Sequence, residues 1–295
     1  MAERERLDRY LVRSGAVASR RAADELIASG GVTINGRRPR KSDLVSSNDT
    51  IEVAAPERLD PIVAEPLLAV EVLYEDAATI VVNKRGGIPC HPLKAGEVGT
   101  VMNAVVACYP ETAAAGPKPL EGGLVHRLDN GTSGALIIAR NREAYAILHN
   151  AIRSGAVARE YLALVAGNVA RAMMLDAPIA HHAKNARKMM LGAEGSSRKR
   201  AGRAAYSAVE PKRRVGEFTL VTIAPRTGSR HQIRVHLANA GYPIIGDTLY
   251  GGPPHDALAP GRFWLHLTRI SFESAAGVRV SVEAPLPADL KSLLR

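Results

Sequence analysis

The stretch GGLVHRLDNGTSG, residues 122–134, decides how this chain can fold, because it runs directly into the apolar segment ALIIA at 135–139. A short apolar run after a turn-forming sequence predicts a buried strand. Asp129 therefore stands at the entrance to that strand. Farther along, in RHQIRVH at 230–236, Arg234 lies between two apolar residues. Because a lone buried charge is unfavourable, we predict that Asp129 and Arg234 pair with each other.

The composition limits the class of protein. The chain has 295 residues, 46% of them hydrophobic, which is enough for one large domain and one small one. No apolar run reaches the roughly 18 residues that a membrane span needs, and the charged N-terminus lacks a signal-peptide core. Cys90 and Cys108 show neither metal-ligand nor disulfide spacing, so we interpret both as packing residues. We expect a cytoplasmic protein with no metal site and no membrane association.

The net charge of +10 favours an anionic partner. Residues 171–214 hold eleven Lys or Arg and only three acids. Such clustering is typical of a phosphate-binding surface, although a flexible solvated insert would have the same composition. Within this segment, residues 184–203 include the loop-like GAEGSS and are predicted to form a mobile basic loop that closes over RNA. Its candidate RNA contacts are Arg198, Lys199 and Arg200.

Residues 1–58 predict a small unit of two helices and a hairpin. An apolar face that starts at Leu7 marks the first helix, and Ser19 is suited to cap the second. VTING at 32–36 and IEV at 51–53 predict two strands, with a tight Asn-Gly turn after the first. Taken alone, the basic residues of this unit would be interpreted as a solvated face. Those near the second helix and the hairpin are Arg20, Arg21, Arg37, Arg38, Arg40 and Lys41, and all but Arg40 are candidate RNA contacts.

Residues 59–68 contain two prolines and no periodic pattern, which predicts a linker before a larger domain at 69–295. In that domain Asn141 and Gly155 are placed to cap the two ends of a helix. Strands outnumber helices and come in hairpins, so we expect an α+β fold with a largely antiparallel sheet. The predicted helix covers 142–154, and predicted strands cover 79–84, 159–165 and 218–223.

The segment from His126 to Gly134 resembles the His-Arg-Leu-Asp-x-x-Thr-Ser-Gly signature of the RluA-type pseudouridine synthases. Lys84, followed by a glycine turn and the pair His91-Pro92, is similar to the opening of that family's catalytic domain, although a structural turn would explain these residues equally well. SRR at 19–21 and GVTING at 31–36 resemble the small RNA-binding domain named after ribosomal small-subunit protein S-four. The resemblance implies a small N-terminal α/β domain that grips structured RNA with its basic residues. It also implies a synthase domain with a largely antiparallel mixed sheet.

The resemblance implies a chemistry as well. Pseudouridine formation neither adds nor removes atoms overall, so no redox cofactor is expected. Asp129 would supply a carboxylate at the ribose, as nucleophile or as base. Arg234 would keep that carboxylate ionised and oriented, and Tyr161 would lie against the uracil or the ribose. Because a paired base must be extruded, Arg127 would occupy the vacated space, while His126 would contact the RNA backbone or buttress the loop.

Structural interpretations compete with these roles. Asp-Asn-Gly is a common turn, so Asp129 could merely start one. The flanking signature, with Tyr161 and Arg234 in order downstream, favours the catalytic interpretation. No third ligand supports a metal site at the later histidines. The residues assigned to the scaffold rather than to chemistry are His231, His236, Asp247 and Tyr250.

We therefore predict a monomeric RNA pseudouridine synthase that needs no cofactor. The expected substrate is large-subunit ribosomal RNA, with transfer RNA as an alternative. The competing class is a non-catalytic RNA-binding factor for ribosome assembly that keeps the same fold. A buried pair of Asp129 and Arg234 favours the enzyme, because RNA binding alone would not require it.

Overall fold

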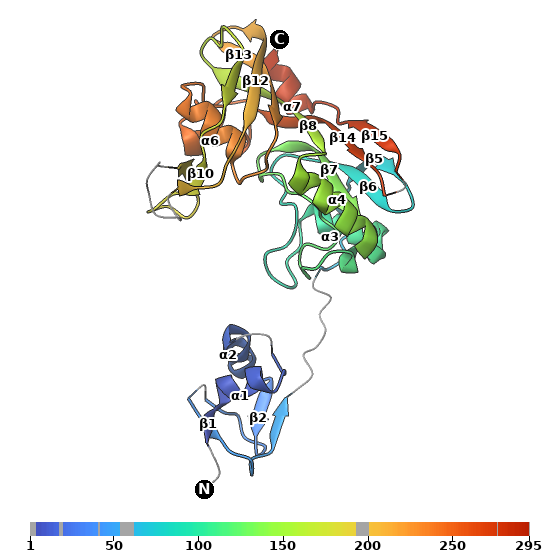
Figure 1. Ribbon diagram of the computed structural model, residues 1–295, viewed down its shortest axis with the longest axis vertical. Helices are drawn as coiled ribbons and strands as arrows, with labels where there is room; N and C mark the ends of the chain where they lie inside the picture. The colour runs from blue at the N-terminus through green and yellow to red at the C-terminus, as the bar shows by residue number, and fades with distance from the viewer. Residues whose placement is uncertain are drawn as a thin grey trace. The chain divides into compact units, whose positions relative to one another are not determined.

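The structure is a computed structural model that describes residues 4–17, 20–40, 42–53, 62–192, 201–275 and 277–294. The side chains of residues 21 and 25 are also left undescribed. The chain divides into two compact units, Met1–Leu59 and Asp60–Arg295 (Figure 1). Several predicted features lie outside the described residues, namely the Ser19 cap, the Arg21 side chain, Lys41, Arg198, Lys199 and Arg200.

The first unit has the predicted two helices and short strands. Its elements are β1 (Glu5–Arg6), α1 (Leu7–Arg13), α2 (Arg20–Ser29), β2 (Val32–Ile34), β3 (Leu44–Val45) and β4 (Ile51–Val53). Leu7 and Leu11 of α1 pack with Ile27 of α2 in a small apolar core. β2 pairs antiparallel with β4, as predicted. Asn35 and Gly36, with φ of 50° and 75°, form the tight turn after β2, because both residue types tolerate left-handed backbone.

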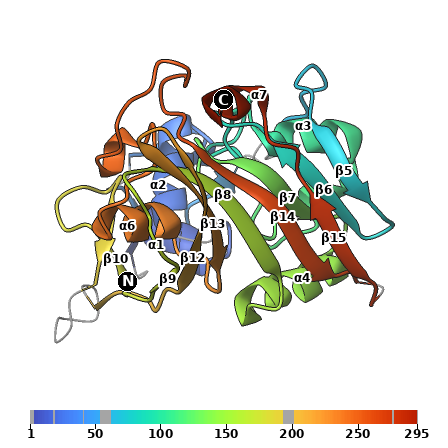
Figure 2. The ribbon, with the colours of Figure 1, turned by 90° about the horizontal axis from the view of Figure 1, so that it is seen from above.

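The second unit is built on a nine-stranded sheet, in which eight strands follow the order β5-β6-β7-β14-β8-β13-β12-β9 and the ninth, β15, pairs with β14 (Figure 2). The described pairings are antiparallel except that of β7 with β14, which is parallel. This is the largely antiparallel mixed sheet that was predicted. Its strands are β5 (Glu71–Glu75), β6 (Thr79–Lys84), β7 (Ser133–Ala139), β8 (Ala158–Ala166), β9 (Met173–Leu175), β12 (Ser207–Val215), β13 (Phe218–Pro225), β14 (Leu265–Glu273) and β15 (Arg279–Glu283).

Helices and a small hairpin complete this unit. They are α3 (Val101–Cys108), η1 (Pro110–Ala114), α4 (Arg142–Ser154), β10 (Ile179–His181), β11 (Met189–Leu191), α6 (Gln232–Asn239), η2 (Thr248–Tyr250), α7 (Ala288–Lys291) and η3 (Ser292–Leu294). α4 has the predicted bounds, because Asn141 accepts a hydrogen bond from the Ala144 N–H at 2.9 Å and Gly155 ends the helix with φ of 79°. α4 packs beside β7, whereas α6 lies beside β11 and β12 (Figure 1). The strand after Asp129 and the helix that carries Arg234 thus belong to opposite halves of the unit.

One element was not predicted, and one prediction is wrong in part. α3 carries no amphipathic signal, because its residues from Val101 to Val106 are all buried. Residues 189–191 lie within the predicted basic loop at 184–203, but they form the strand β11. Met189 is buried there and packs with Ile179 and Val235, so this apolar stretch gains a core of its own. Residues 193–200 lie outside the described part of the chain.

The main core lines the large sheet, with Trp264 fully buried in it. Among the described residues, no helix combines the length and the apolar character required to cross a bilayer.

Candidate active site

Asp129 lies in the turn that feeds β7, and two buried cations hold the backbone of that turn. Lys84, at the end of β6, donates hydrogen bonds to the carbonyl oxygens of residues 130 and 132, at 3.0 and 2.7 Å. Nη1 of the buried Arg262 donates a hydrogen bond to the carbonyl oxygen of residue 131, which lies between them, at 2.5 Å. Burial lowers the pKa of Lys84 to about 8. Three successive carbonyls therefore face fixed donors, which sets the direction in which Asp129 points.

Two small residues complete this support. The buried Cys90 thiol lies 3.3 Å from the carbonyl oxygen of Leu128 and 3.4 Å from its nitrogen, donating to the first and accepting from the second. Gly134 has φ of 122°, and a Cβ there would lie 2.2 Å from the carbonyl oxygen of Leu267 in β14. The final glycine of the 122–134 segment thus allows β7 and β14 to approach closely.

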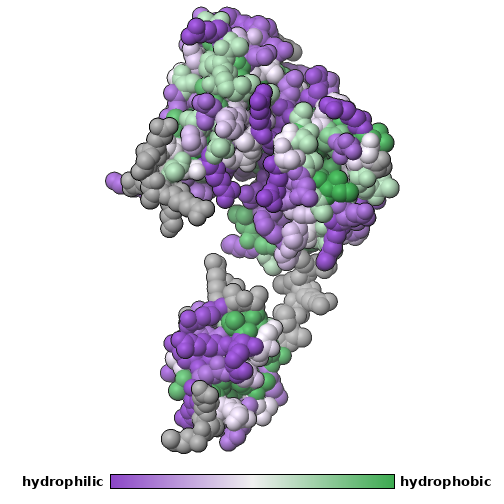
Figure 3. All heavy atoms as spheres, viewed as in Figure 1, coloured by the Kyte–Doolittle hydropathy of each residue, from purple (hydrophilic) through white to green (hydrophobic). Residues whose placement is uncertain are grey.

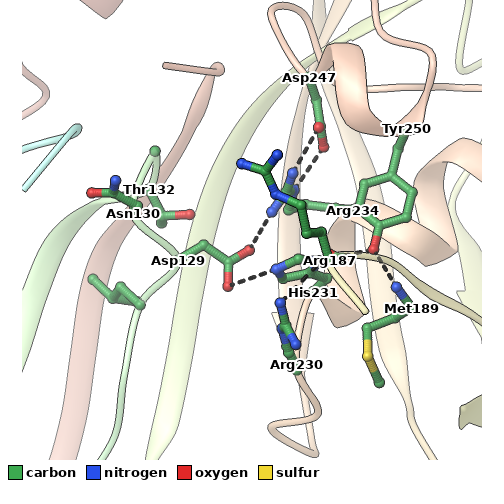
Figure 4. A network of polar contacts seen from close by, with 12 residues as sticks. Asp129, Asn130, Thr132, Arg187, Met189, Arg230, His231, Arg234, Asp247 and Tyr250 are labelled. Carbon is green, nitrogen blue, oxygen red and sulfur yellow. Dashed lines mark hydrogen bonds and ion pairs between the residues drawn. The ribbon is translucent and has the colours of Figure 1, made fainter. Parts of the chain in front are cut away.

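Arg234 bridges two carboxylates (Figure 4). Its Nη1 donates to Asp129 Oδ2 at 2.9 Å, so the predicted ion pair is formed. Its Nε and Nη2 donate to the two oxygens of Asp247 at 2.7 and 2.8 Å. The rings of Tyr250 and Phe263 lie 5.0 and 4.3 Å from its guanidinium carbon. Two oxygens and two ring faces therefore fix the side chain that reaches Asp129.

His231 faces the other carboxylate oxygen of Asp129 and belongs to a chain of hydrogen bonds (Figure 4). The Tyr250 hydroxyl accepts from the Met189 N–H at 2.8 Å and lies 2.8 Å from Nδ1 of His231, to which it can donate its own hydrogen. Burial lowers the pKa of His231 to about 4, so the ring is neutral at pH 7. In the tautomer whose Nδ1 accepts from Tyr250, the ring hydrogen is on Nε2, which lies 3.9 Å from Asp129 Oδ1. His231 also has an unusual φ of 54°.

Tyr161 lies in β8, the strand next to β14. Its side chain is buried, and no described residue makes a hydrogen bond with its hydroxyl. Burial raises the pKa of Tyr161 to about 12, and the negative charge of Asp129 acts in the same direction. The phenol is thus a neutral group near Asp129 with an available hydroxyl.

The two other residues of the Asp129 segment that were predicted to meet RNA differ in exposure. The Arg127 side chain is 60% exposed, and its Nη1 lies 3.9 Å from Glu121. His126 is half-buried and accepts a hydrogen bond from the Ile137 N–H at 3.1 Å. His126 thus ties the loop to β7, which favours the buttressing role over contact with the RNA backbone. Hydrophilic residues border the hollow between the α3–α4 side and the α6 side of this unit (Figure 3).

Arg20, Arg37 and Arg38, the described members of the first unit's predicted RNA contacts, are exposed. Arg20 donates to Asp8 at 2.8 Å, while Arg38 donates to the Ala28 carbonyl at 2.6 Å. Arg37 is exposed in the turn after β2. Their contact with RNA stays a prediction.

The place of His231 beside Asp129 was not predicted from the sequence, and neither was that of Arg262. One signal for His231 was present, since it stands three residues before Arg234, immediately ahead of α6. No sequence pattern indicates Arg262, because its contact with residue 131 spans 131 positions of the chain. Within the described residues, no group of three or more His, Cys, Asp or Glu is placed to hold a metal ion.

Comparisons with known proteins agree with this geometry. The family profile described as RNA pseudouridylate synthase matches residues 78–239, and that of the S4 domain matches residues 5–51. An uncharacterized RNA pseudouridine synthase of Chloroflexus aurantiacus is 36% identical, over 99% of this chain and 89% of the relative. Ribosomal large subunit pseudouridine synthase D of Pseudomonas aeruginosa is 32% identical, over 99% of this chain and 92% of the relative.

The fold comparison points the same way. Human RNA Pseudouridylate Synthase Domain Containing 1 superposes with a TM-score of 0.60 at 24% identity, covering 76% of this chain and 87% of that structure. At that identity the likeness concerns the fold. The sequence matches are longer and closer, and they agree with the signature around Asp129. The chain therefore belongs to the RluA-type RNA pseudouridine synthases and carries an N-terminal S4 domain.

Proposed function

We propose that this enzyme converts uridines of large-subunit ribosomal RNA to pseudouridine and uses Asp129 as its catalytic carboxylate. The names of the Pseudomonas aeruginosa and Xanthomonas campestris relatives support the ribosomal target. One observation carries the choice of Asp129. Arg234 holds two carboxylates, of which Asp247 is 2% exposed with both oxygens bound, whereas Asp129 is 23% exposed and its Oδ1 accepts no hydrogen bond from a described residue. Asp129 is thus the carboxylate with an oxygen available to a substrate.

The reaction can be balanced on these groups. The bond from ribose C1′ to uracil N1 breaks, a bond from C1′ to C5 forms, the hydrogen of C5 leaves, and N1 gains a proton. Asp129 acts at the ribose, either as a nucleophile at C1′ or as a base toward the sugar. Arg234 compensates its charge and fixes its direction. Both routes leave the atom count of the substrate unchanged.

Tyr161 and His231 complete this proposal. The buried phenol of Tyr161 lies against the detached base, and its hydroxyl has no described partner with which the base would compete. The neutral His231 presents an Nε2–H toward Asp129 Oδ1 and the substrate, without adding a second positive charge beside Arg234. The two residues would hold the base and the carboxylate in place while the base turns.

A pseudouridine map of cellular RNA tests the proposed target. Comparing cells with and without this gene, we expect a discrete loss of pseudouridine in large-subunit ribosomal RNA. Loss only in transfer RNA would replace the proposed substrate by the alternative one. An unchanged map in all RNA, in cells where no second enzyme modifies the same site, would contradict the proposed reaction in vivo.

The first unit and Arg127 complete the proposal. We place RNA binding on residues 1–58 because the S4 profile matches there and Arg20, Arg37 and Arg38 are exposed. Arg127 would fill the space that the extruded nucleotide leaves. Deleting residues 1–58 is expected to weaken RNA binding and its salt dependence while turnover at saturating RNA persists. The cytoplasmic location and the monomeric state stay predictions.

A further inference from the structure

Arg159, two residues before Tyr161 in β8, is a buried cation that no described carboxylate neutralises. The residue is 8% exposed. Its Nη2 donates one hydrogen bond, to the Thr227 carbonyl at 3.1 Å, and its Nε is buried without a partner among the described residues. A buried charge with so few partners is unfavourable unless another group compensates it. An anion that enters with the substrate would do so.

The position of Arg159 decides which anion can reach it. Alternate residues of a strand share a face, so Arg159 and Tyr161 lie on the same side of the sheet, about 6.6 Å apart along the strand. The intervening Glu160 faces the other side, where it lies 3.6 Å from Arg269. The pKa of His126 is lowered to about 3 by burial and by the positive charge of Arg159, which places the guanidinium near the loop that carries Asp129.

The guanidinium also lies just beneath an exposed turn. A Cβ at Gly228 would be 3.1 Å from Arg159 Nη1, and Gly228 itself is exposed. Nη1 makes no hydrogen bond with a described residue. The glycine at 228 therefore places no side chain over Nη1 of Arg159.

We infer that Arg159 binds a backbone phosphate of the RNA, at or next to the nucleotide whose base faces Tyr161. The inference rests on the proposed function, because the phosphodiester is the anion that RNA brings into the site. A guanidinium matches it, since its planar set of N–H donors suits a phosphate better than a point charge would. Arg159 would thus place the target nucleotide before chemistry begins.

The test uses the full chain with Asp129→Asn as background, so that RNA binds without being converted. The probes are unmodified transcripts of large-subunit ribosomal RNA and of a transfer RNA, with phosphates ethylated at random. Arg159→Met is compared with Arg140→Met, which removes the same charge from an arginine paired with Glu75 and Glu111.

For Arg159→Met we expect weaker binding and a slope of log affinity against log salt that is shallower by about 0.7–0.9, the amount for one phosphate contact. Ethylation of one phosphate, or of two adjacent ones, weakens binding of the parent and no longer affects Arg159→Met. Arg140→Met keeps the parent slope and the parent interference pattern. An unchanged slope and an unchanged pattern for Arg159→Met overturn the inference, even if the enzyme proves active on ribosomal RNA.

Thermal melting separates a binding role from a structural one. A residue that serves only the fold would lower the melting temperature when replaced. We expect Arg159→Met to melt at or above the parent temperature, because an apolar side chain replaces an uncompensated buried charge. Arg159→Lys keeps the charge and is expected to keep the salt slope, which tests the inference again if the Met variant folds poorly. Parent-like binding with a lowered melting temperature overturns it.

Discussion

Replacing Asp247 by Asn tests how firmly the Arg234 bridge is built. Asp247 is 2% exposed and receives hydrogen bonds from Arg234 at 2.7 and 2.8 Å. The amide keeps the shape of the side chain but loses its charge and turns an N–H₂ toward the guanidinium. Arg234 then keeps only Asp129 as a charged partner, and that side chain is partly exposed.

The magnitude follows from this burial. Breaking a buried ion pair by removing one partner lowers the free energy of unfolding by about 3–5 kcal/mol, and the remaining Asp129 places the change near the lower end, about 3 kcal/mol. For a domain of this size, that corresponds to a fall in melting temperature of about 6–12 °C. Turnover is expected to fall by up to about 100-fold, because a misplaced Arg234 misdirects Asp129.

Melting followed by circular dichroism and single-turnover kinetics on the same samples measure both effects. Asp256→Asn is the matched control, because the same chemical change falls on an exposed loop residue and is expected to change stability by less than about 0.5 kcal/mol. A fall in melting temperature below about 2 °C for Asp247→Asn, with wild-type turnover, would refute the reasoning that the bridge positions Asp129.

Three further changes test other parts of the account. Arg234→Lys keeps the charge but cannot bridge both carboxylates with a planar fork, so turnover is expected to fall at least tenfold at nearly unchanged RNA affinity; wild-type turnover would count against the bridge. Lys84→Met removes the side-chain donor to the carbonyl of residue 132 and one of two donors to that of residue 130, which keeps the Gly87 N–H; it is expected to lower turnover and stability, whereas the exposed Lys94→Met changes neither. The pKa of Lys84 is about 8 in the folded protein and 10.5 ordinarily, so the unfolded chain binds more protons between these pH values. The wild type is therefore expected to gain stability relative to Lys84→Met as the pH rises from 8 to 10.5. A difference in melting temperature that does not change with pH would contradict this. Hydrogen bonds from Arg6 and Arg20 lower the pKa of Asp8 from 3.8 to about 2. The stability that Asp8 gives the first unit is therefore present above pH 4 and lost toward pH 2. In chemical unfolding, Asp8→Asn is expected to be less stable than the wild type at pH 6 and to converge with it as the pH falls.

Local signals explain what the sequence analysis predicted well. Asn141 and Gly155 have the cap chemistry that ends a helix, and the apolar run at 135–139 has the composition of a buried strand. The pair of Asp129 and Arg234 was also predictable, because each charge lies in an apolar setting and the two satisfy each other. These features depend on neighbours in the chain or on the rule that buried charges are paired.

The remainder depends on contacts that no local pattern encodes. α3 is buried on nearly all sides, so it lacks the periodicity that marks a surface helix. The parallel pairing of β7 with β14 joins segments far apart in the chain. The roles of Lys84 and His231 arise from what lies opposite them, namely the carbonyls of the Asp129 turn and the Tyr250 hydroxyl. Such partners become visible only when the fold is known.

The most direct test of the central claim measures tritium release from large-subunit ribosomal RNA transcribed with uridine tritiated at C5, because the hydrogen at C5 leaves when that carbon joins the ribose. Wild type and Asp129→Asn are compared at equal, saturating protein, with binding of the same RNA measured in parallel. The account predicts release by the wild type and none above background by Asp129→Asn, which still binds the RNA. Release by Asp129→Asn at a rate near that of the wild type would contradict the assignment of Asp129 as the catalytic carboxylate.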